Sequence, residues 1–388
     1  MSAGRPDGVL MVSSWWPTAA RPHERPFVLD HACALQRAVG DVECWAVVPG
    51  VRTRRSGPRG SATTGLTVVK RSPRVPWRLA RRRAGSALLF LAGWVHGRRL
   101  RARPRAVLVQ GFDYAGAYAL GLARAVDRPL VYLEHWSAVA LQELSEQQLA
   151  TLRRVIAGAD VVLAVSRYLA AALERVGDLP AGSVGVVGNA VDPSVFAPTP
   201  PPRRNGTTIT QVADFRPVKG HDLLVETLLL LGGEQLDALD LRFVLVGDGP
   251  ERGEVERRLA AVPAVARRVN FTGTLPRAGV AEAMGATDWT LLTSTSETFS
   301  CVSMESLAIG RRVIAPDVGA LATLVCGDDG VLYRRCPEGL AGALRRAAEL
   351  GPDDGWRRRA ERAVARFGPD VLCRAYEELF RSLGTTRR

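Results

Sequence analysis

The sequence predicts an α/β protein built from two doubly wound domains that face each other across a cleft. Three observations lead to this fold class. Short apolar runs alternate with helix-length segments along nearly the whole chain. The runs are continuous rather than alternating, as expected of parallel strands buried on both faces. A proline-rich stretch, Pro198–Asn205, interrupts the alternation near the middle of the 388 residues.

The runs that predict strands are short and rich in β-branched residues. In the first half they are Val9–Val12, Cys44–Val48, Leu66–Val69, Ala106–Val109, Pro129–Leu133, Val161–Val165 and Val184–Val187. In the second half they are Thr207–Val212, Phe243–Val246, Val269–Thr272, Trp289–Leu292, Val313–Ala315 and Val331–Tyr333. Among the segments between them, Phe27–Val39 predicts a helix, because its apolar residues share one face.

The break at Pro198–Asn205 predicts the linker, since four prolines can continue neither a helix nor a central strand. We expect an N-terminal domain over 1–198 and a C-terminal domain over 206–368, each large enough to bury its own core. The last residues, 369–388, contain an amphipathic segment whose spacing fits a helix capping either domain.

The composition is basic: 52 lysines and arginines stand against 39 acidic residues, with a pI near 10.3. Anionic partners fit such a chain, but the charge alone selects none of them. The six cysteines lack zinc or redox spacing, and we find neither a secretory leader pattern nor an apolar run of membrane length. We therefore expect mostly buried thiols, a reducing compartment and a cytoplasmic protein.

The most informative motif is Ser294–Gly319, STSETFSCVSMESLAIGRRVIAPDVG. A polar loop after a strand carries Glu297; a helix then starts near Ser300, a good N-cap, includes Glu305 and stops at Gly310. The free N–H groups of such a helix start suit a diphosphate. The two glutamates can accept hydrogen bonds from sugar and ribose hydroxyls. Two glutamates at this spacing often occur by chance, so the strand–loop–helix setting is what indicates a site.

A second motif, Asp214–Gly220 (DFRPVKG), follows the strand Thr207–Val212. Arg216 and Lys219 lie on a loop before a helix, expected over Asp222–Leu231, where two cations can stabilise a departing diphosphate. Arg216 is one of fifty arginines, so a surface role competes with this interpretation. Lys219 is harder to dismiss, because the chain contains only one other lysine.

Weaker signals come from two turns and a histidine. Gly247 and Gly249 in the turn VGDGP, and Gly273 after a strand, allow close backbone approach to a ligand, although ordinary turns fit equally well. His135 follows the strand Pro129–Leu133 at its carboxyl end and is expected to point towards the cleft, where it either contacts a hydroxyl or is structural. We interpret the other histidines as structural: His23, His31, His96 and His221.

No DxD and no cluster of His, Asp or Glu at metal spacing occurs, so we expect no metal. The basic stretch 78–105 brackets an apolar centre with arginines. A surface helix with cationic ends is the simpler interpretation, and peripheral docking to the inner face of a membrane, near a lipid-linked acceptor, stays open as the alternative. Nucleic acid is not an expected partner, since RNP-type aromatics and zinc knuckles are absent.

Together these motifs resemble those of the retaining nucleotide-sugar glycosyltransferases of family four, the "group 1" enzymes with the GT-B fold of two Rossmann-like domains. The resemblance extends over almost the whole chain. Glu297 and Glu305 match the family's Glu-x7-Glu, and the turns VGDGP and FTGTL match its donor-binding domain. Val187–Phe196 is similar to its NGVD…F segment, Ala159–Ser166 to its AD…VS strand, and Phe367–Leu383 to a helix that crosses back to the first domain.

The resemblance implies a UDP- or GDP-linked sugar donor as co-substrate, with no further cofactor. Glu305 would bind the nucleotide ribose and Glu297 the sugar hydroxyls, Arg216 and Lys219 would hold the diphosphate, and His135 would lie near the acceptor. Four of these residues form the implied catalytic group: Glu297, His135, Arg216 and Lys219. The implied donor-binding residues besides Glu305 are Phe299, Ser300, Cys301, Val302, Gly247, Gly249, Gly273 and Leu275. The implied reaction is retaining, metal-independent transfer to a small-molecule acceptor of secondary-metabolite type, a saccharide or a lipid-linked acceptor.

The chain departs from the family in several loops. Arg25-Pro26-Phe27 lacks the usual glycine before the phenylalanine, Ser300 and Ala190 replace glycines, and Arg216 and Lys219 are closer together than in the commoner GR…KG pattern. None of these changes removes a charged group. Two alternatives stay open: a nucleotide-sugar epimerase of the same fold, and a catalytically silent sugar-binding partner.

Overall fold

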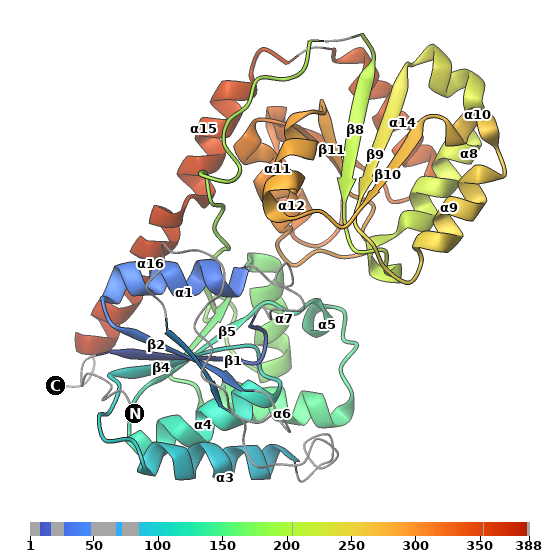
Figure 1. Cartoon of the computed structure of the whole chain (residues 1–388). Helices are drawn as coiled ribbons and strands as arrows, with labels where there is room; N and C mark the ends of the chain where they lie inside the picture. The colour runs from blue at the N-terminus through green and yellow to red at the C-terminus, as the bar shows by residue number, and fades with distance from the viewer. Residues whose placement is uncertain are drawn as a thin grey trace. The chain divides into compact units, whose positions relative to one another are not determined.

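The computed structural model describes residues 8–16, 27–47, 67–71, 85–203, 205–351 and 353–385. Residue contacts divide the chain into two compact units, one within 1–190 and 369–388 and the other within 191–368 (Figure 1). Each unit is a parallel β-sheet covered by helices. The α/β fold class predicted from the apolar runs is therefore confirmed.

The first unit is built on a sheet whose described strands run in the order β3-β2-β1-β4-β5-β6-β7, with every pair parallel. The strands are β1 (Val9–Ser13), β2 (Val42–Val47), β3 (Thr67–Arg71), β4 (Ala106–Gln110), β5 (Leu130–Glu134), β6 (Val161–Ala164) and β7 (Gly185–Val186). The central strands β1, β4 and β5 are buried along their whole length, which explains their continuous apolar sequences.

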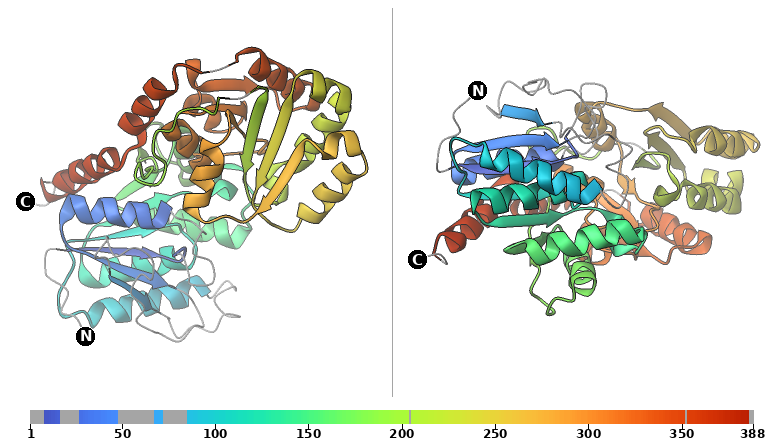
Figure 2. Two further views of the ribbon diagram at one scale, coloured as in Figure 1. Left: turned by 45° about the horizontal axis from the view of Figure 1, so that its top comes forward. Right: turned by 90° about the horizontal axis from the view of Figure 1, so that it is seen from below.

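The helices of the first unit include the C-terminal one. They are α1 (Phe27–Val39), α3 (Gly85–Arg98), α4 (Tyr114–Val126), α5 (Ser137–Ala140), α6 (Glu146–Gly158), α7 (Arg167–Gly177) and α16 (Pro369–Thr385). α3 and α4 pack side by side, and α16 packs against α1, as can be followed in Figure 1 and in the left view of Figure 2. The buried stripe of α16 consists of Leu372, Cys373, Tyr376 and Phe380. The amphipathic pattern of this segment is thus satisfied by packing against α1.

The second unit repeats the design with the described strand order β10-β9-β8-β11-β12-β13. Its strands are β8 (Thr207–Val212), β9 (Leu241–Val246), β10 (Val269–Gly273), β11 (Trp289–Leu291), β12 (Arg312–Pro316) and β13 (Gly330–Tyr333). Its helices are η1 (Pro217–Lys219), α8 (His221–Ala238), α9 (Arg252–Ala260), α10 (Pro263–Ala266), α11 (Arg277–Gly285), α12 (Cys301–Ile309), α13 (Leu321–Leu324), η2 (Gly327–Asp329), α14 (Pro337–Glu349) and α15 (Trp356–Phe367).

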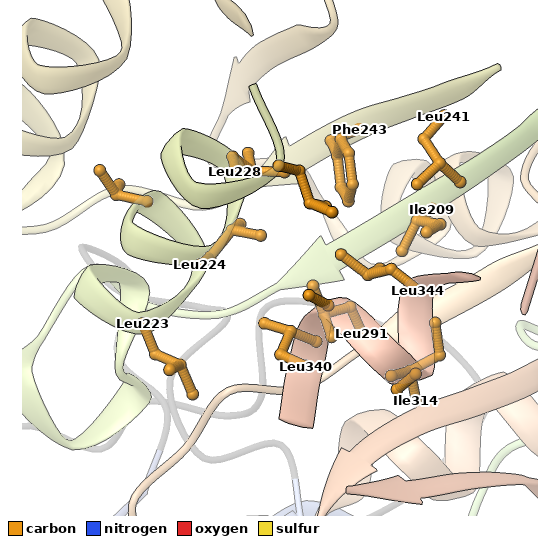
Figure 3. Packing of buried hydrophobic residues seen from close by; sticks show 14 of the residues in the cluster. Ile209, Leu223, Leu224, Leu228, Leu241, Phe243, Leu291, Ile314, Leu340 and Leu344 are labelled. Carbon is orange, nitrogen blue, oxygen red and sulfur yellow. The ribbon is translucent and has the colours of Figure 1, made fainter. Parts of the chain in front are cut away.

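The core of the second unit lies between its sheet and the helices α8 and α14. Figure 3 shows apolar side chains of both helices packed on those of the strands. The labelled residues are Ile209, Leu223, Leu224, Leu228, Leu241, Phe243, Leu291, Ile314, Leu340 and Leu344. Each fully buried side chain of this kind contributes about 1.5–3 kcal/mol relative to an exposed one. This core fixes β8 and β11, whose ends carry the motifs singled out above.

The proline-rich stretch predicted as the linker belongs to the second unit. The Thr199 N–H donates to the Ile309 carbonyl at 3.0 Å, and the buried Arg311 guanidinium donates to the carbonyls of Thr199 and Pro200 at 2.8 and 2.9 Å. These bonds attach the stretch to α12 and β12. The chain passes between the units at Ala190 and again at Gly368.

Some expectations need correction. The helix expected over Asp222–Leu231 extends to Ala238, with a non-helical Gly232 inside it. All six cysteines are free, but only Cys44 and Cys373 are buried, so most are not. The ends of several expected features lie outside the described residues: Leu66, Val48, residues 78–84 of the basic stretch and Arg25-Pro26. Among the described helices, none combines the length and the apolar character needed to cross a bilayer.

Candidate functional site

Two loops of the second unit leave the sheet side by side, because β8 pairs with β11 where the strand order reverses. Ligands of open parallel sheets bind at such points. Gln211 Nε2 donates to the Thr293 hydroxyl at 2.8 Å, and that hydroxyl donates to the Lys219 carbonyl at 2.7 Å. The Thr295 N–H donates to the Val218 carbonyl at 2.9 Å. The loops carrying the two main motifs are therefore joined by hydrogen bonds.

Lys219 and Glu297, both predicted as catalytic, form an ion pair. Lys219 Nζ lies 2.7 Å from Glu297 Oε1, and the Ser294 hydroxyl donates to the same oxygen at 2.8 Å. Burial acts to lower the pKa of Lys219, but the Glu297 carboxylate, helped by Asp214, outweighs it and raises that pKa above the ordinary lysine value. Lys219 is thus an ammonium ion at neutral pH. Within the described part of the chain, Glu297 Oε2 accepts no hydrogen bond.

Two glycines allow the backbone to close around this ion pair. Gly319 has φ +58°, and a Cβ there would lie 2.3 Å from the Glu297 carbonyl oxygen, which accepts the Ala320 N–H at 2.8 Å. Gly220 has φ +64°, and a Cβ there would lie 2.3 Å from the Thr293 carbonyl oxygen. A side chain at Gly220 would push the Lys219 loop away from the loop after β11, and one at Gly319 would push the segment after β12 away from Glu297.

The helix α12 begins and ends as the sequence predicts, with Ser300 as N-cap and Gly310 as C-cap. Ser300 Oγ accepts the Ser303 N–H at 3.3 Å, although the Ser300 backbone has φ +68°. A non-glycine residue pays about 1–2 kcal/mol for this left-handed conformation, which glycine adopts freely. The first turn, with Cys301 and Val302, presents backbone N–H groups at the carboxyl edge of the sheet.

Glu305, inside α12, is a buried carboxylate with an arginine nearby. Arg277 Nη2 lies 4.0 Å from Glu305 Oε1, and its guanidinium lies over the Phe196 ring, 5.4 Å from the centroid. Sequence reasoning missed Arg277, since nothing local distinguishes it from the other arginines. Only the packing of α11 against α12 reveals it.

Two predicted residues have side chains directed elsewhere. Arg216 is exposed and pairs with Asp214 of its own loop at 2.8 Å. Phe299 is buried and packs edge-on against Phe367, with ring centroids 5.9 Å apart. Of the two predicted cations, Lys219 contacts Glu297 and Arg216 pairs with Asp214 instead. The role implied for Phe299 concerns its backbone, and burial of its ring is compatible with that role.

The predicted glycine turns, with Gly247, Gly249 and Gly273, lie behind the Lys219 loop. Leu275, also predicted, is half-buried. The Phe215 N–H donates to the Asp248 carbonyl at 3.0 Å, and the Gly247 N–H donates to the Gly273 carbonyl at 2.9 Å. These bonds give the two glycine turns a structural role beside any contact with a ligand.

Three buried polar atoms of these loops have no hydrogen-bond partner among the residues that the structure describes: Gln211 Oε1, Ser296 Oγ and His221 Nδ1. Buried polar groups are nearly always bonded, so unpaired ones indicate where a ligand would supply partners. Sequence reasoning did not single out Gln211 or Ser296, and it interpreted His221 as structural. The signal available was position, because Gln211 nearly ends β8 and His221 starts α8.

In the first unit, His135 follows β5 and is surrounded by rings. Phe27 stacks on it with centroids 4.6 Å apart, while His31 and Trp15 meet it edge-on at 5.1 and 6.2 Å. Burial, and after it the neighbouring His31, lower the pKa of His135 well below 6.5, although the nearby Asn189 side chain acts to raise it. His135 is therefore a neutral imidazole at physiological pH.

The residue before it, Glu134, fixes the turn at this strand end. Its buried carboxylate accepts the N–H groups of His135 and Trp136 at 2.7 and 2.8 Å and the hydroxyl of Tyr132. Burial raises the pKa of Glu134, and these hydrogen bonds oppose the rise. Nowhere in the described ranges are three His, Cys, Asp or Glu side chains arranged to hold a metal ion.

Comparison with solved structures defines the class of fold. A crystal structure of Anabaena HepE in complex with UDP and glucose covers 97% of this chain and 100% of its own, with a TM-score of 0.72 and 17% identity. The sucrose-phosphate synthase of Thermosynechococcus elongatus covers 98% of this chain and 100% of its own, with a TM-score of 0.73 and 19% identity. The fold is that of the GT-B glycosyltransferases.

Family models then specify the group. The model described as "Glycosyltransferase Family 4" matches residues 27–195, and the one described as "Glycosyl transferases group 1" matches residues 206–349. The two matches together take in most of both units. The chain belongs to the group 1, family-four glycosyltransferases.

Curated relatives match parts of the chain. A D-inositol 3-phosphate glycosyltransferase of Thermomonospora curvata is 30% identical over an alignment of 254 residues that covers 55% of this chain and 57% of the relative. A GDP-mannose-dependent alpha-(1-6)-phosphatidylinositol dimannoside mannosyltransferase of Mycobacterium tuberculosis is 32% identical over 108 residues, 28% of this chain and 27% of the relative. The chain thus spans less than two thirds of the length of these relatives.

Proposed function

We propose that this chain is a retaining, metal-independent glycosyltransferase that moves a sugar from a UDP- or GDP-sugar to a hydroxyl group of a small-molecule, saccharide or lipid-linked acceptor. The observation that carries the proposal is the Lys219–Glu297 ion pair at the carboxyl edge of the second sheet, beside the start of α12. Family membership and the unpaired polar atoms of the same loops support it.

The donor is expected to bind with its diphosphate between the Lys219 ammonium and the first turn of α12. Glu297 Oε2 would then accept a hydrogen bond from a sugar hydroxyl. Glu305, with Arg277 beside it, would bind the nucleotide ribose. Arg216 is exposed and only two residues from its partner Asp214, so it is free to turn towards phosphate by giving up a weak surface ion pair.

The reaction proposed is front-face transfer. The bond between the anomeric carbon and the diphosphate oxygen breaks, the acceptor oxygen bonds to the same face of that carbon, and a leaving phosphate oxygen takes the acceptor proton. Negative charge builds on the diphosphate, where Lys219 and the helix N–H groups stabilise it. His135, neutral in the first unit, is proposed to hydrogen-bond a substrate hydroxyl rather than to act as an acid.

The relatives suggest where to look for the acceptor. One acts on D-inositol 3-phosphate and another on a phosphatidylinositol dimannoside. A cyclitol phosphate and its lipid-linked form are therefore the first acceptors to test with this chain, ahead of free saccharides.

For a lipid-linked acceptor, we propose that α3 docks on an anionic membrane surface. Its outer face exposes Leu91 (54%) and Trp94 (41%) where a soluble helix would carry charges, and the Arg98 guanidinium lies 5.5 Å from the Trp94 ring centroid. Exposed arginines follow at once: Arg99, Arg101, Arg103 and Arg105. This combination suits an acidic lipid interface. Co-sedimentation with phosphatidylglycerol-containing vesicles should exceed that with neutral vesicles and fall in a Leu91→Ser/Trp94→Ser variant; equal sedimentation of all samples would refute the docking.

The test of function begins with thermal shifts in the presence of UDP, GDP and their sugars, since a ligand that binds the folded state raises its apparent stability. Each stabilising sugar nucleotide is then incubated with the acceptors, and products are identified by mass spectrometry and NMR. Transfer to an acceptor with retained anomeric configuration supports the proposal. Formation of an epimer of the donor would favour the epimerase instead, and tight donor binding without turnover would favour a silent sugar-binding partner.

A further inference from the structure

His31, which the sequence suggests is merely structural, lies at the meeting point of three segments of the first unit. It belongs to α1 and is completely buried. Its Nδ1 lies 2.6 Å from the hydroxyl of Tyr376 on α16, and its Nε2 lies 3.1 Å from Oδ1 of Asn189. A buried imidazole with a partner on each nitrogen is held in one orientation.

The partners also determine which nitrogen carries the proton. Burial lowers the pKa of His31 to about 4, so it is neutral and has one N–H. Asn189 Oδ1 can only accept, so Nε2 is the donor and Nδ1 accepts from the Tyr376 hydroxyl. Burial also raises the pKa of Tyr376, which keeps that hydroxyl protonated. The chain of hydrogen bonds therefore runs from α16 through His31 to Asn189.

His31, in the middle of these hydrogen bonds, also contacts the predicted catalytic histidine, His135. The His31 ring meets the His135 ring edge-on at 5.1 Å, with an interplanar angle of 89°. Phe27, one turn earlier on α1, stacks on the face of His135 at 4.6 Å. Two side chains of α1, Phe27 and His31, thus pack against the His135 imidazole. Tyr376 of α16 holds His31 in place by a hydrogen bond.

We propose that His31 and Tyr376 are positioning residues for His135, through which the C-terminal helix sets the orientation of that imidazole. The inference rests on the proposed function for its kinetic consequence. Neither residue contacts substrate in this proposal. Shifting a positioned group by a fraction of an ångström lowers the rate of reaction more than the binding of substrate.

The chain offers a matched control, because a second contact joins the same two helices. Arg37 on α1 pairs with Asp370 on α16 at 2.5 Å, but both side chains are exposed (53% and 68%), whereas His31 is completely buried. Asp370→Asn weakens the α1–α16 contact without altering the buried chain of hydrogen bonds. Tyr376→Phe removes only the buried hydroxyl.

We expect Tyr376→Phe to lower kcat about 10-fold with the donor KM changed less than about twofold, and Asp370→Asn to leave both unchanged. His31→Gln, which keeps an N–H for Asn189, should retain most of the kcat that His31→Leu loses. A loss of kcat in Tyr376→Phe no larger than in Asp370→Asn, or equal losses in His31→Gln and His31→Leu, would overturn the positioning role.

A second measurement needs no turnover. The ring-nitrogen NMR signals of His135, assigned by their absence in His135→Gln, should shift in Tyr376→Phe and stay in place in Asp370→Asn. Unmoved signals in Tyr376→Phe would overturn the inference even if the enzyme is active. If wild-type protein transfers no sugar to any acceptor, the proposed function fails while the NMR shift still decides the positioning of His135.

Discussion

Replacing Lys219 with alanine should destabilise the second unit, because it leaves the Glu297 carboxylate buried with Ser294 as its remaining side-chain donor. A hydrogen bond to a charged group contributes about 1.5–3 kcal/mol, and breaking a fully buried ion pair costs about 3–5 kcal/mol. The Lys219 side chain is 26% exposed, so water screens part of the charge. We expect a loss of about 2 kcal/mol, which lowers the melting temperature of a unit of this size by about 4–8 °C.

The assay is a double-mutant cycle by calorimetry or denaturant unfolding, with Lys219→Ala, Glu297→Gln and both together. Because the two groups interact directly, the double variant should lose about 1–2 kcal/mol less than the two single losses combined. Arg216→Ala is the control: its ion pair with Asp214 is 57% and 65% exposed, so its removal should change stability by less than about 0.5 kcal/mol.

The pH dependence of the free energy of unfolding of these variants tests the same ion pair. The fold raises the pKa of Lys219 above 10.5, so its stabilising contribution is complete below that pH and is lost only as the pH rises through the higher folded value. The difference between wild type and Lys219→Ala should therefore be constant across neutral pH. Additive losses in the cycle, or an Arg216→Ala variant as unstable as Lys219→Ala, would refute the interaction inferred from the 2.7 Å contact.

Four further outcomes are expected. Gly319→Ala should lower the free energy of unfolding by about 3 kcal/mol and also lower turnover, because the new Cβ would lie 2.3 Å from the Glu297 carbonyl oxygen. Gly327→Ala, a control with the same φ of +58° but open space around it, should lower it by about 1 kcal/mol. Equal unfolding midpoints for the two variants would contradict this. Ser300→Gly should gain about 0.5–1 kcal/mol in denaturant unfolding because it relieves φ +68° at small capping cost, and a loss would show that the cap dominates. Burial lowers the pKa of His31 to about 4, so on acidification the unfolded chain protonates this histidine at a higher pH than the folded chain does. The free energy of unfolding should therefore fall as the pH drops from about 6.5 to about 4. His31→Gln should make this part of the curve, measured by calorimetry, less steep. Chelation by EDTA should leave the rate of sugar transfer unchanged, and a loss restored by a divalent cation would end the metal-independent proposal.

Most of the fold could be predicted because its signals are local. The helix expected over Phe27–Val39 and the strand over Thr207–Val212 have the predicted bounds. The helix α8 extends beyond its expected end at Leu231, because the non-helical Gly232 interrupts it and the helix then resumes to Ala238. Gly233 is pressed against Ala264 of α10, and this tertiary contact accompanies the resumed helix. Such long-range packing leaves no mark in a single segment.

The residues of the candidate site also differ in whether local sequence is enough to predict them. Glu297 and Lys219 could be singled out from a motif and from the rarity of lysine, but their contact depends on the adjacency of β8 and β11, which strand spacing alone does not give. Arg277 was not singled out and His31 was interpreted as structural, because their partners are distant in sequence: Glu305 for one, Asn189 and Tyr376 for the other. Residues of ordinary type become recognisable only through such partners.

The two cations of DFRPVKG illustrate how backbone geometry divides residues that look equivalent in sequence. Arg216 lies in extended conformation just before the turn η1 and reaches Asp214, two residues back, as a local ion pair on the surface. Lys219 ends that turn, and the left-handed Gly220 after it redirects the chain into α8 against the Thr293 carbonyl. The ammonium group is thereby directed to the β11 loop and Glu297. One turn and one glycine therefore decide which cation is held at the carboxylate and which one remains on the surface.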